Sequence, residues 1–70
     1  MTNPTPKIYP VAGQIWIYTK NLTTYEIISV GQLKVEGIDW IPAVTYRSRQ
    51  NGEYYTRDIK TFMEKFEDLT

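Results

Sequence analysis

The chain has 70 residues, enough for one small domain whose core alone gives a thin margin of stability. It contains no cysteine and no histidine, which excludes disulfides and thiolate or imidazole metal sites. Self-association is the remaining way to stabilise so small a domain, and we expect a homo-oligomer. Eight basic residues balance eight acidic ones, and this zero net charge argues against binding to duplex nucleic acid, which needs a basic excess.

The N-terminal segment is predicted to be an extended arm over residues 1–12, followed by a single domain over residues 13–70. Pro4, Pro6 and Pro10 each remove a backbone donor and favour an extended conformation in the residue before them. The segment has no apolar run of the kind found in signal peptides, and no stretch of the chain approaches the ~18 apolar residues of a membrane span. We therefore expect a cytoplasmic protein that does not bind a membrane.

Two strand-like runs come next, and their pattern predicts a β-hairpin. Residues 14–18 alternate between two faces, and residues 25–30 are rich in β-branched and aromatic side chains. Polar residues around Asn21 form the turn between these runs. Residues 32–39 also alternate, which allows the sheet to continue as far as Gly37.

A second hairpin is predicted around Asn51-Gly52. Residues 40–47 fit a third strand, entered through Pro42, which lacks an amide hydrogen and therefore belongs at the start or at an edge. An Asn-Gly pair between strand-like runs favours a hairpin because both residues tolerate a positive φ. Residues 53–56 are the returning strand.

Between Thr56 and Asp58 the apolar period changes from two to about 3.6 residues, which predicts a short amphipathic helix over residues 58–67. Its apolar stripe consists of Ile59, Phe62, Met63 and Phe66. Thr56 or Asp58 can cap its first turn. The predicted fold class is therefore mainly β: a small SH3-like antiparallel barrel or curved sheet, with the short C-terminal α-helix as a lid.

The chain offers no recognisable catalytic centre. A nucleophilic triad needs a base beside a hydroxyl or thiol, and the usual imidazole is missing. The eight carboxylates are scattered without the spacing of metal ligands, and the four glycines stand singly rather than in a phosphate-binding loop. We predict no catalytic residue, no metal site and no cofactor, and therefore a protein that binds rather than catalyses.

Aromatic residues make up 14% of the chain, more than so small a core needs. Five of them are predicted to form the core: Trp16, Tyr25, Trp40, Phe62 and Phe66. Three more lie beside arginines on the strands of the second hairpin: Tyr46, Tyr54 and Tyr55, with Arg47, Arg49 and Arg57. Such a face can stack a base and pair a phosphate, or can form a protein interface. The plain alternative is cross-strand tyrosine pairs with exposed arginines.

Several short motifs occur at spacings that are recognisable as a set. They are Gly13-Gln14-Ile15-Trp16, Asn21 with Tyr25-Glu26-Ile27, Val44-Thr45-Tyr46-Arg47, Gly52 with Tyr55-Thr56-Arg57, and Phe62-Met63-Glu64-Lys65-Phe66-Glu67. The set resembles a family of small bacterial and phage domains, the DUF1653-type proteins. That family tends to have a histidine after the first aromatic residue and Arg-Pro before the helix, where this chain has Tyr18 or its neighbours and Arg57-Asp58. The resemblance implies an SH3-like barrel with a candidate surface of Tyr46, Arg47, Tyr55 and Arg57.

A short, cysteine-free, single-domain chain of this style also resembles the small accessory proteins that phages carry. Some of those proteins are anti-defence sponges of the anti-CBASS kind, oligomers that sequester cyclic nucleotide immune signals without cleaving them. The resemblance implies a viral protein in the host cytoplasm that sequesters a cyclic nucleotide at an interface between copies of itself.

On this interpretation the ligand-binding residues are Tyr46, Tyr54 and Tyr55 for stacking, Trp40 as a further stacking candidate, and Arg47 and Arg57 for phosphate. The alternative is a protein–protein interaction module, an inhibitor of a host protein, that uses the same face or an edge strand. Weak binding of single-stranded nucleic acid is a third hypothesis, which the zero net charge disfavours.

Overall fold

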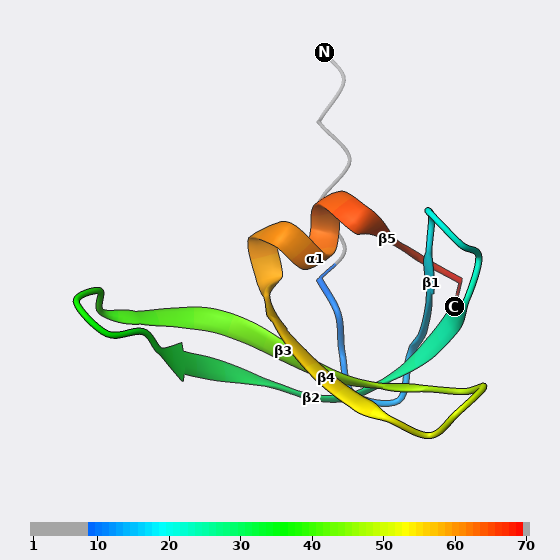
Figure 1. Cartoon of the computed structure of the whole chain (residues 1–70), viewed down its shortest axis with the longest axis horizontal. Coiled ribbons are helices and arrows are strands. Elements are labelled where there is room, and N and C mark those ends of the chain that lie inside the picture. Colours follow the sequence, from blue (N-terminus) through cyan, green and yellow to red (C-terminus); the bar gives the residue numbers. More distant parts are fainter. Residues whose placement is uncertain (1–8, 70) are drawn as a thin grey trace, which may run out of the picture.

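The computed structural model describes residues 9–69, so the predicted arm lies mostly outside the described residues. Residues 9–69 form five strands and one short helix: β1 (Ile15–Tyr18), β2 (Thr24–Lys34), β3 (Trp40–Ser48), β4 (Tyr54–Asp58), α1 (Ile59–Lys65) and β5 (Phe66–Asp68). These strands belong to one antiparallel sheet in the order β4-β3-β2-β1-β5. The sheet curves strongly, and α1 connects its two edge strands, β4 and β5 (Figure 1). The predicted fold class, a mainly β curved sheet with a short C-terminal helix, is confirmed.

Polar and glycine residues fix the two tight hairpin turns. In the turn between β1 and β2, Asn21 Oδ1 accepts a hydrogen bond from the backbone N–H of Thr23 at 3.0 Å. In the turn between β3 and β4, Gly52 has a φ of 75°, a left-handed conformation that favours glycine. Both predicted hairpins are confirmed.

β2 and β3 form a long hairpin, as the alternation of residues 32–39 allows, with Gly37 in its turn. β2 continues to Lys34 because it pairs with β3 as far as Trp40. β1 covers only the first residues of β2, and β4 covers only the second half of β3, so residues 28–42 form a two-stranded ribbon that projects from the body (Figure 1). We call this segment the ribbon. An irregularity in the pairing between Ile27 and Ser29 separates it from the body.

α1 begins after Asp58, whose side chain caps the first turn by accepting a hydrogen bond from the backbone N–H of Thr61 at 2.9 Å. The prediction that the helix runs to residue 67 is wrong. The helix ends at Lys65, and Phe66–Asp68 form β5, which pairs with β1. The reason is that Phe66 remains buried as a strand residue, while pairing with β1 supplies hydrogen-bond partners for the backbone beyond Lys65.

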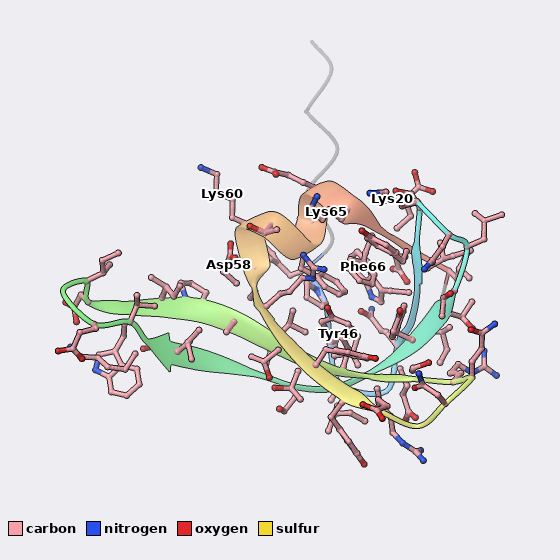
Figure 2. The ribbon with its side chains drawn as sticks, viewed as in Figure 1. Lys20, Tyr46, Asp58, Lys60, Lys65 and Phe66 are labelled. Carbon is pink, nitrogen blue, oxygen red and sulfur yellow. The ribbon has the colours of Figure 1, made fainter. Side chains whose placement is uncertain are left out.

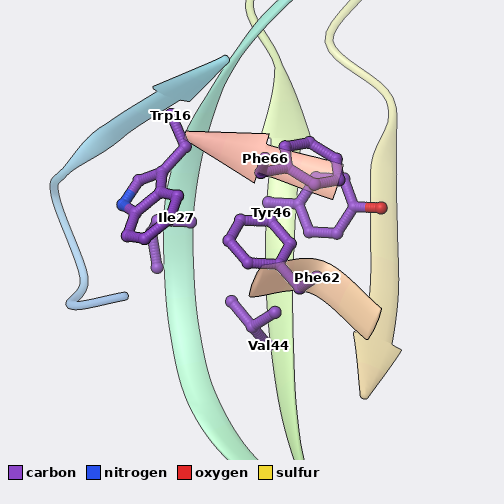
Figure 3. Packing of buried hydrophobic residues seen from close by; sticks show 6 residues of the cluster. All are labelled: Trp16, Ile27, Val44, Tyr46, Phe62 and Phe66. Carbon is purple, nitrogen blue, oxygen red and sulfur yellow. The ribbon is translucent and has the colours of Figure 1, made fainter. Parts of the chain in front are cut away.

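The hydrophobic core lies between α1 and the sheet (Figure 3). It consists of the buried side chains Trp16, Ile27, Val44, Tyr46, Phe62 and Phe66. The predicted core positions of Trp16, Phe62 and Phe66 are confirmed, and Tyr25 packs against this cluster while half-buried. The prediction that Trp40 belongs to the core is wrong: this side chain is 57% exposed, because the ribbon carries it beyond the reach of the body.

Candidate functional site

An open aromatic pocket of about 160 Å³ is formed jointly by all the strands of the sheet. Its lining consists of Tyr18, Tyr25, Tyr46, Tyr55, Arg57 and Phe66. The strand register explains why these residues meet, since Tyr18 is opposite Phe66 across β1 and β5, and Tyr46 is opposite Tyr55 across β3 and β4. Tyr25, on the intervening strand β2, contacts both pairs. Figure 2 shows Tyr46 and Phe66 on the side of the sheet that faces α1.

Contacts between rings hold the walls of the aromatic pocket. Tyr46 and Tyr55 stack with their centroids 5.7 Å apart and their planes at 29°. Tyr25 presents its edge to Tyr46 at 5.2 Å and to Phe66 at 5.5 Å. The rings of Tyr18 and Phe66 lie 5.0 Å apart. Because each ring is restrained by another, a flat ligand ring meets walls that are already in place.

Arg57 supplies a cation inside this aromatic lining. Its Nε donates a hydrogen bond to the hydroxyl oxygen of Tyr46 at 2.8 Å. Its Cζ lies 6.0 Å from the ring centroid of Tyr18 and 5.9 Å from that of Phe66, within the range of cation–π attraction. Within residues 9–69, the single ion pair joins Lys34 to Asp39, so Arg57 forms no salt bridge with a described carboxylate, and the charge of Asp58 acts on it only from beyond salt-bridge distance. The guanidinium is therefore held in place by Tyr46 and the aromatic rings rather than by a salt bridge.

The electrostatics of this pair keep Arg57 charged and Tyr46 neutral. The hydrogen bond with Tyr46 raises the pKa of Arg57. Burial raises the pKa of Tyr46, although the same hydrogen bond and the nearby guanidinium charge oppose that rise. Burial also raises the pKa of Tyr25. At neutral pH the pocket thus presents the charged guanidinium of Arg57 beside the neutral phenols of Tyr25 and Tyr46.

The structure brings together only some of the predicted ligand-binding residues. Tyr46, Tyr55 and Arg57 lie in the aromatic pocket. Arg47 and Tyr54 face each other across β3 and β4 on the opposite side of the sheet, with Arg47 Cζ 5.7 Å from the ring centroid of Tyr54.

Trp40 lies apart from both groups. It is on the ribbon, where Lys34 Nζ sits 5.7 Å from the centroid of its ring. Trp40 therefore does not contribute to the aromatic pocket as one chain forms it.

Sequence reasoning missed Tyr18, Tyr25 and Phe66 as lining residues. Tyr25 and Phe66 match the core pattern, and their core role conceals that they also border the pocket. The alternation of residues 14–18 does indicate Tyr18 as a lining residue. It places Tyr18 on the same face as the buried Trp16 but two residues further along, at the end of the strand, where an aromatic ring can border a pocket.

A wider groove lies beside α1 and is chemically different from the aromatic pocket. Its volume is about 1080 Å³ and it runs between α1, the base of the ribbon at Ile41 and Pro42, and Tyr9. Its floor is apolar, and its charged lining residues are Asp58, Lys60, Glu64, Glu67 and Asp68. Carboxylates outnumber the single ammonium there, so this groove disfavours a phosphate, whereas the aromatic pocket favours one.

The described part of the chain contains neither a cluster of metal-ligating side chains nor a helix that could span a membrane. Residues 9–69 contain no group of three or more Asp, Glu, His or Cys side chains that could hold a metal ion. The only helix in that range is too short and too polar to cross a bilayer.

Comparison with known proteins gives no family for this chain. No family model matches it, and no curated protein or solved structure matches it. The resemblance to DUF1653-type domains therefore stays a prediction, carried by the sequence motifs alone.

Proposed function

We propose that this protein is a non-enzymatic binding protein that sequesters a cyclic nucleotide, with one base in the aromatic pocket and a phosphate on Arg57. The observation that carries the proposal is a guanidinium that forms no salt bridge with a described carboxylate, inside a lining of five aromatic rings. Stacking on an aromatic side chain contributes about 1–3 kcal/mol per base. A charge-assisted bond from a guanidinium to phosphate adds directional recognition.

The size of the pocket sets how the ligand would be held. A volume of about 160 Å³ is below the ~300–1,000 Å³ typical of small-molecule sites, so one chain has room for a single ring system. The rest of a cyclic nucleotide would lie at the open side, where a second copy would cover it. This is why we propose sequestration at an interface between copies. The further proposal of a phage-type anti-defence protein in the host cytoplasm rests on the sequence resemblance alone.

Calorimetric titration with a panel of cyclic di- and trinucleotides tests the proposal. We expect binding by the wild-type protein and a loss of about 5- to 150-fold in affinity on Tyr55→Ala, which corresponds to removing one stacking contact. Tyr54→Ala is the matched control, because Tyr54 is the neighbouring tyrosine on the opposite face and does not line the pocket. Equal losses in the two variants, or no binding of any cyclic nucleotide by the wild-type protein, would refute the proposal.

A protein–protein interaction module is the second candidate function. The observation that favours it is Tyr54, which is 61% exposed with the guanidinium of Arg47 over its ring, on an edge strand of the sheet. Tyrosine and arginine are enriched in protein interfaces. In this case Tyr54→Ala would abolish capture of a host protein while Tyr55→Ala would not, which is the reverse of the result expected for nucleotide binding.

A further inference from the structure

Among the strands of residues 9–69, none lies along one long edge of β2 in the ribbon. Ile27 is the last residue of β2 that is bonded on the β1 side, through backbone hydrogen bonds with Gly13 and Gln14. From Ile28 to Lys34 the described residues place a strand only on the β3 side. Figure 1 shows this part of β2 extending away from the body with open space on its other side. Its backbone groups on that side are a template for another strand.

The ribbon also gathers apolar side chains that the body does not cover. Ile28, Val30, Leu33, Ile38 and Trp40 are each between 37% and 59% exposed. The register places Val30 on the same face as the buried Val44, and Leu33 pairs with Ile41 on the other face. Both faces of the ribbon therefore expose apolar surface to water.

Proline and charged side chains usually keep a free strand edge from pairing with another chain, and this segment has little of either. Residues 28–33 contain no proline and no charged side chain. The one charge, on Lys34, is paired with Asp39 at 4.0 Å and lies over the ring of Trp40. Gly31 sits in the middle of the segment with nothing within 4 Å of where its Cβ would be, so no contact within the chain requires a glycine there, and glycine inside a strand often marks close approach by another backbone.

We infer that the free edge of β2 in the ribbon pairs with the same edge of a second copy, antiparallel, about a two-fold axis within residues 29–33. An uncharged strand paired with itself in the opposite direction matches its own donors to its own acceptors, which is the geometry of an isologous dimer. The register shift between Ile27 and Ser29 lies where β2 leaves the body, and a bulge of this kind bends a strand.

The position of the axis gives a role to Ile38 and Trp40, which are exposed at the end of the ribbon. A specific interface buries about 800 Å² per partner, more than a six-residue strand edge covers. Gly31 is equally distant in sequence from Val35, where the turn starts, and from Ile27, where the body starts. Antiparallel pairing about Gly31 thus carries the turn of each copy, with Ile38 and Trp40, to the body of the other and supplies the missing area.

This interface is independent of the proposed nucleotide function. The aromatic pocket includes Tyr25 at the other end of β2, so the ribbon contact and any contact that covers the pocket involve different surfaces. A variant that breaks the ribbon dimer is expected to keep the pocket of the single chain intact.

Sedimentation equilibrium and tryptophan fluorescence test the interface together. Trp16 is 2% exposed and Trp40 57% exposed, so a change of emission with protein concentration reports on Trp40. We expect dimers at micromolar concentration, with a blue shift on dimerisation that Trp40→Phe removes. Changing both Val30→Lys and Leu33→Lys should weaken the dimer at least 10-fold. Leu22→Lys is the matched control, because it replaces an even more exposed leucine in the turn between β1 and β2.

A monomer at the highest soluble concentration overturns the inference, and so does equal weakening by the Leu22 control. Cysteine scanning covers the case in which the double variant fails to fold. The chain has no cysteine, so single substitutions at residues 29–33, including Gly31→Cys, introduce the only thiol. Oxidation should cross-link the copies at one or two neighbouring positions, because a disulfide requires Cβ atoms about 4 Å apart. A dimer that cross-links at none of them contradicts the assignment.

Discussion

At the scale of single residues, Tyr46 belongs to the core and to the candidate site at once. Its ring is 3% exposed and packs against Phe62 at 5.2 Å and Phe66 at 5.1 Å. Its hydroxyl, at the end of the same ring, accepts the hydrogen bond that holds Arg57. Tyr46 is therefore a positioning residue, since it places the cation without supplying it.

Alkaline pH is expected to weaken the fold through this phenol. Burial raises the pKa of Tyr46 above its ordinary value of 10.0, so folding favours the neutral phenol. The resulting stability is fully present below pH 10 and is lost as pH rises from there through the raised pKa. Tyr46→Phe retains the ring and removes the titrating group, so chemical denaturation of this variant should show a smaller loss of unfolding free energy above pH 10. Near neutral pH it should cost about 1 kcal/mol, for one partly exposed hydrogen bond to a charged group. An alkaline loss equal to that of the wild-type protein would assign the effect to Tyr25, whose pKa is also raised.

At the scale of elements, the sequence predicts most readily those features that depend on neighbouring residues. The Asn51-Gly52 turn and the start of α1 at Asp58 are local signals, and both occur where predicted. The end of α1 is not local. Phe66 fits the apolar stripe of a helix as well as a buried strand position, and pairing with β1, about fifty residues earlier, decides between them.

The difference between local and long-range signals also explains which residues of the candidate site the sequence predicts. Tyr46, Tyr55 and Arg57 belong to one hairpin, so their proximity follows from register alone. Tyr18 and Phe66 join them only through the pairing of β1 with β5, which no short-range pattern specifies. Trp40 was assigned to the core because an aromatic strand residue is usually buried, and its exposure depends on how far the ribbon extends beyond the body.

The cap of α1 gives a prediction at this scale. The backbone N–H of Thr61 holds the pKa of Asp58 below its ordinary value of 3.8. The ionised carboxylate of Asp58 therefore stabilises the fold at pH values above its ordinary pKa. This contribution is lost as pH falls through the lowered pKa. We expect Asp58→Ala to lower the melting temperature at neutral pH and to differ little from the wild-type protein in strong acid, measured by circular dichroism.

Asp58→Asn is the matched control for this experiment, because an asparagine side chain can cap the helix but does not titrate. Its melting temperature should stay near that of the wild-type protein at neutral pH. It should also lose less stability than the wild-type protein as the solution is acidified. A loss in Asp58→Asn equal to that in Asp58→Ala would show that the charge, and not the cap, stabilises this end of the helix.

At the scale of the whole molecule, the aromatic pocket lies where the two edges of the sheet approach each other. Arg57 on β4 reaches over Phe66 on β5 and Tyr18 on β1, although β4 and β5 share no strand pairing. α1 spans the same gap through the chain, and its Phe62 stacks on Phe66 at 4.2 Å. One aromatic cluster thus both lies between the two edge strands and lines the candidate site.

Phe62 and Phe66 separate these two roles, because both are buried in the core but only Phe66 lines the pocket. Truncating either to alanine costs about 3–5 kcal/mol, close to the whole stability of about 5 kcal/mol expected at the low end for a small domain. Leucine is the better replacement, since it keeps most of the volume and should lower the unfolding free energy by about 1–2 kcal/mol at either position. We expect Phe62→Leu to retain the affinity for a cyclic nucleotide and Phe66→Leu to reduce it, with denaturation curves confirming comparable stability in the two variants. Equal affinities in both would mean that the wall formed by Phe66 does not contact the ligand, and that recognition depends on Tyr55 and Arg57 alone.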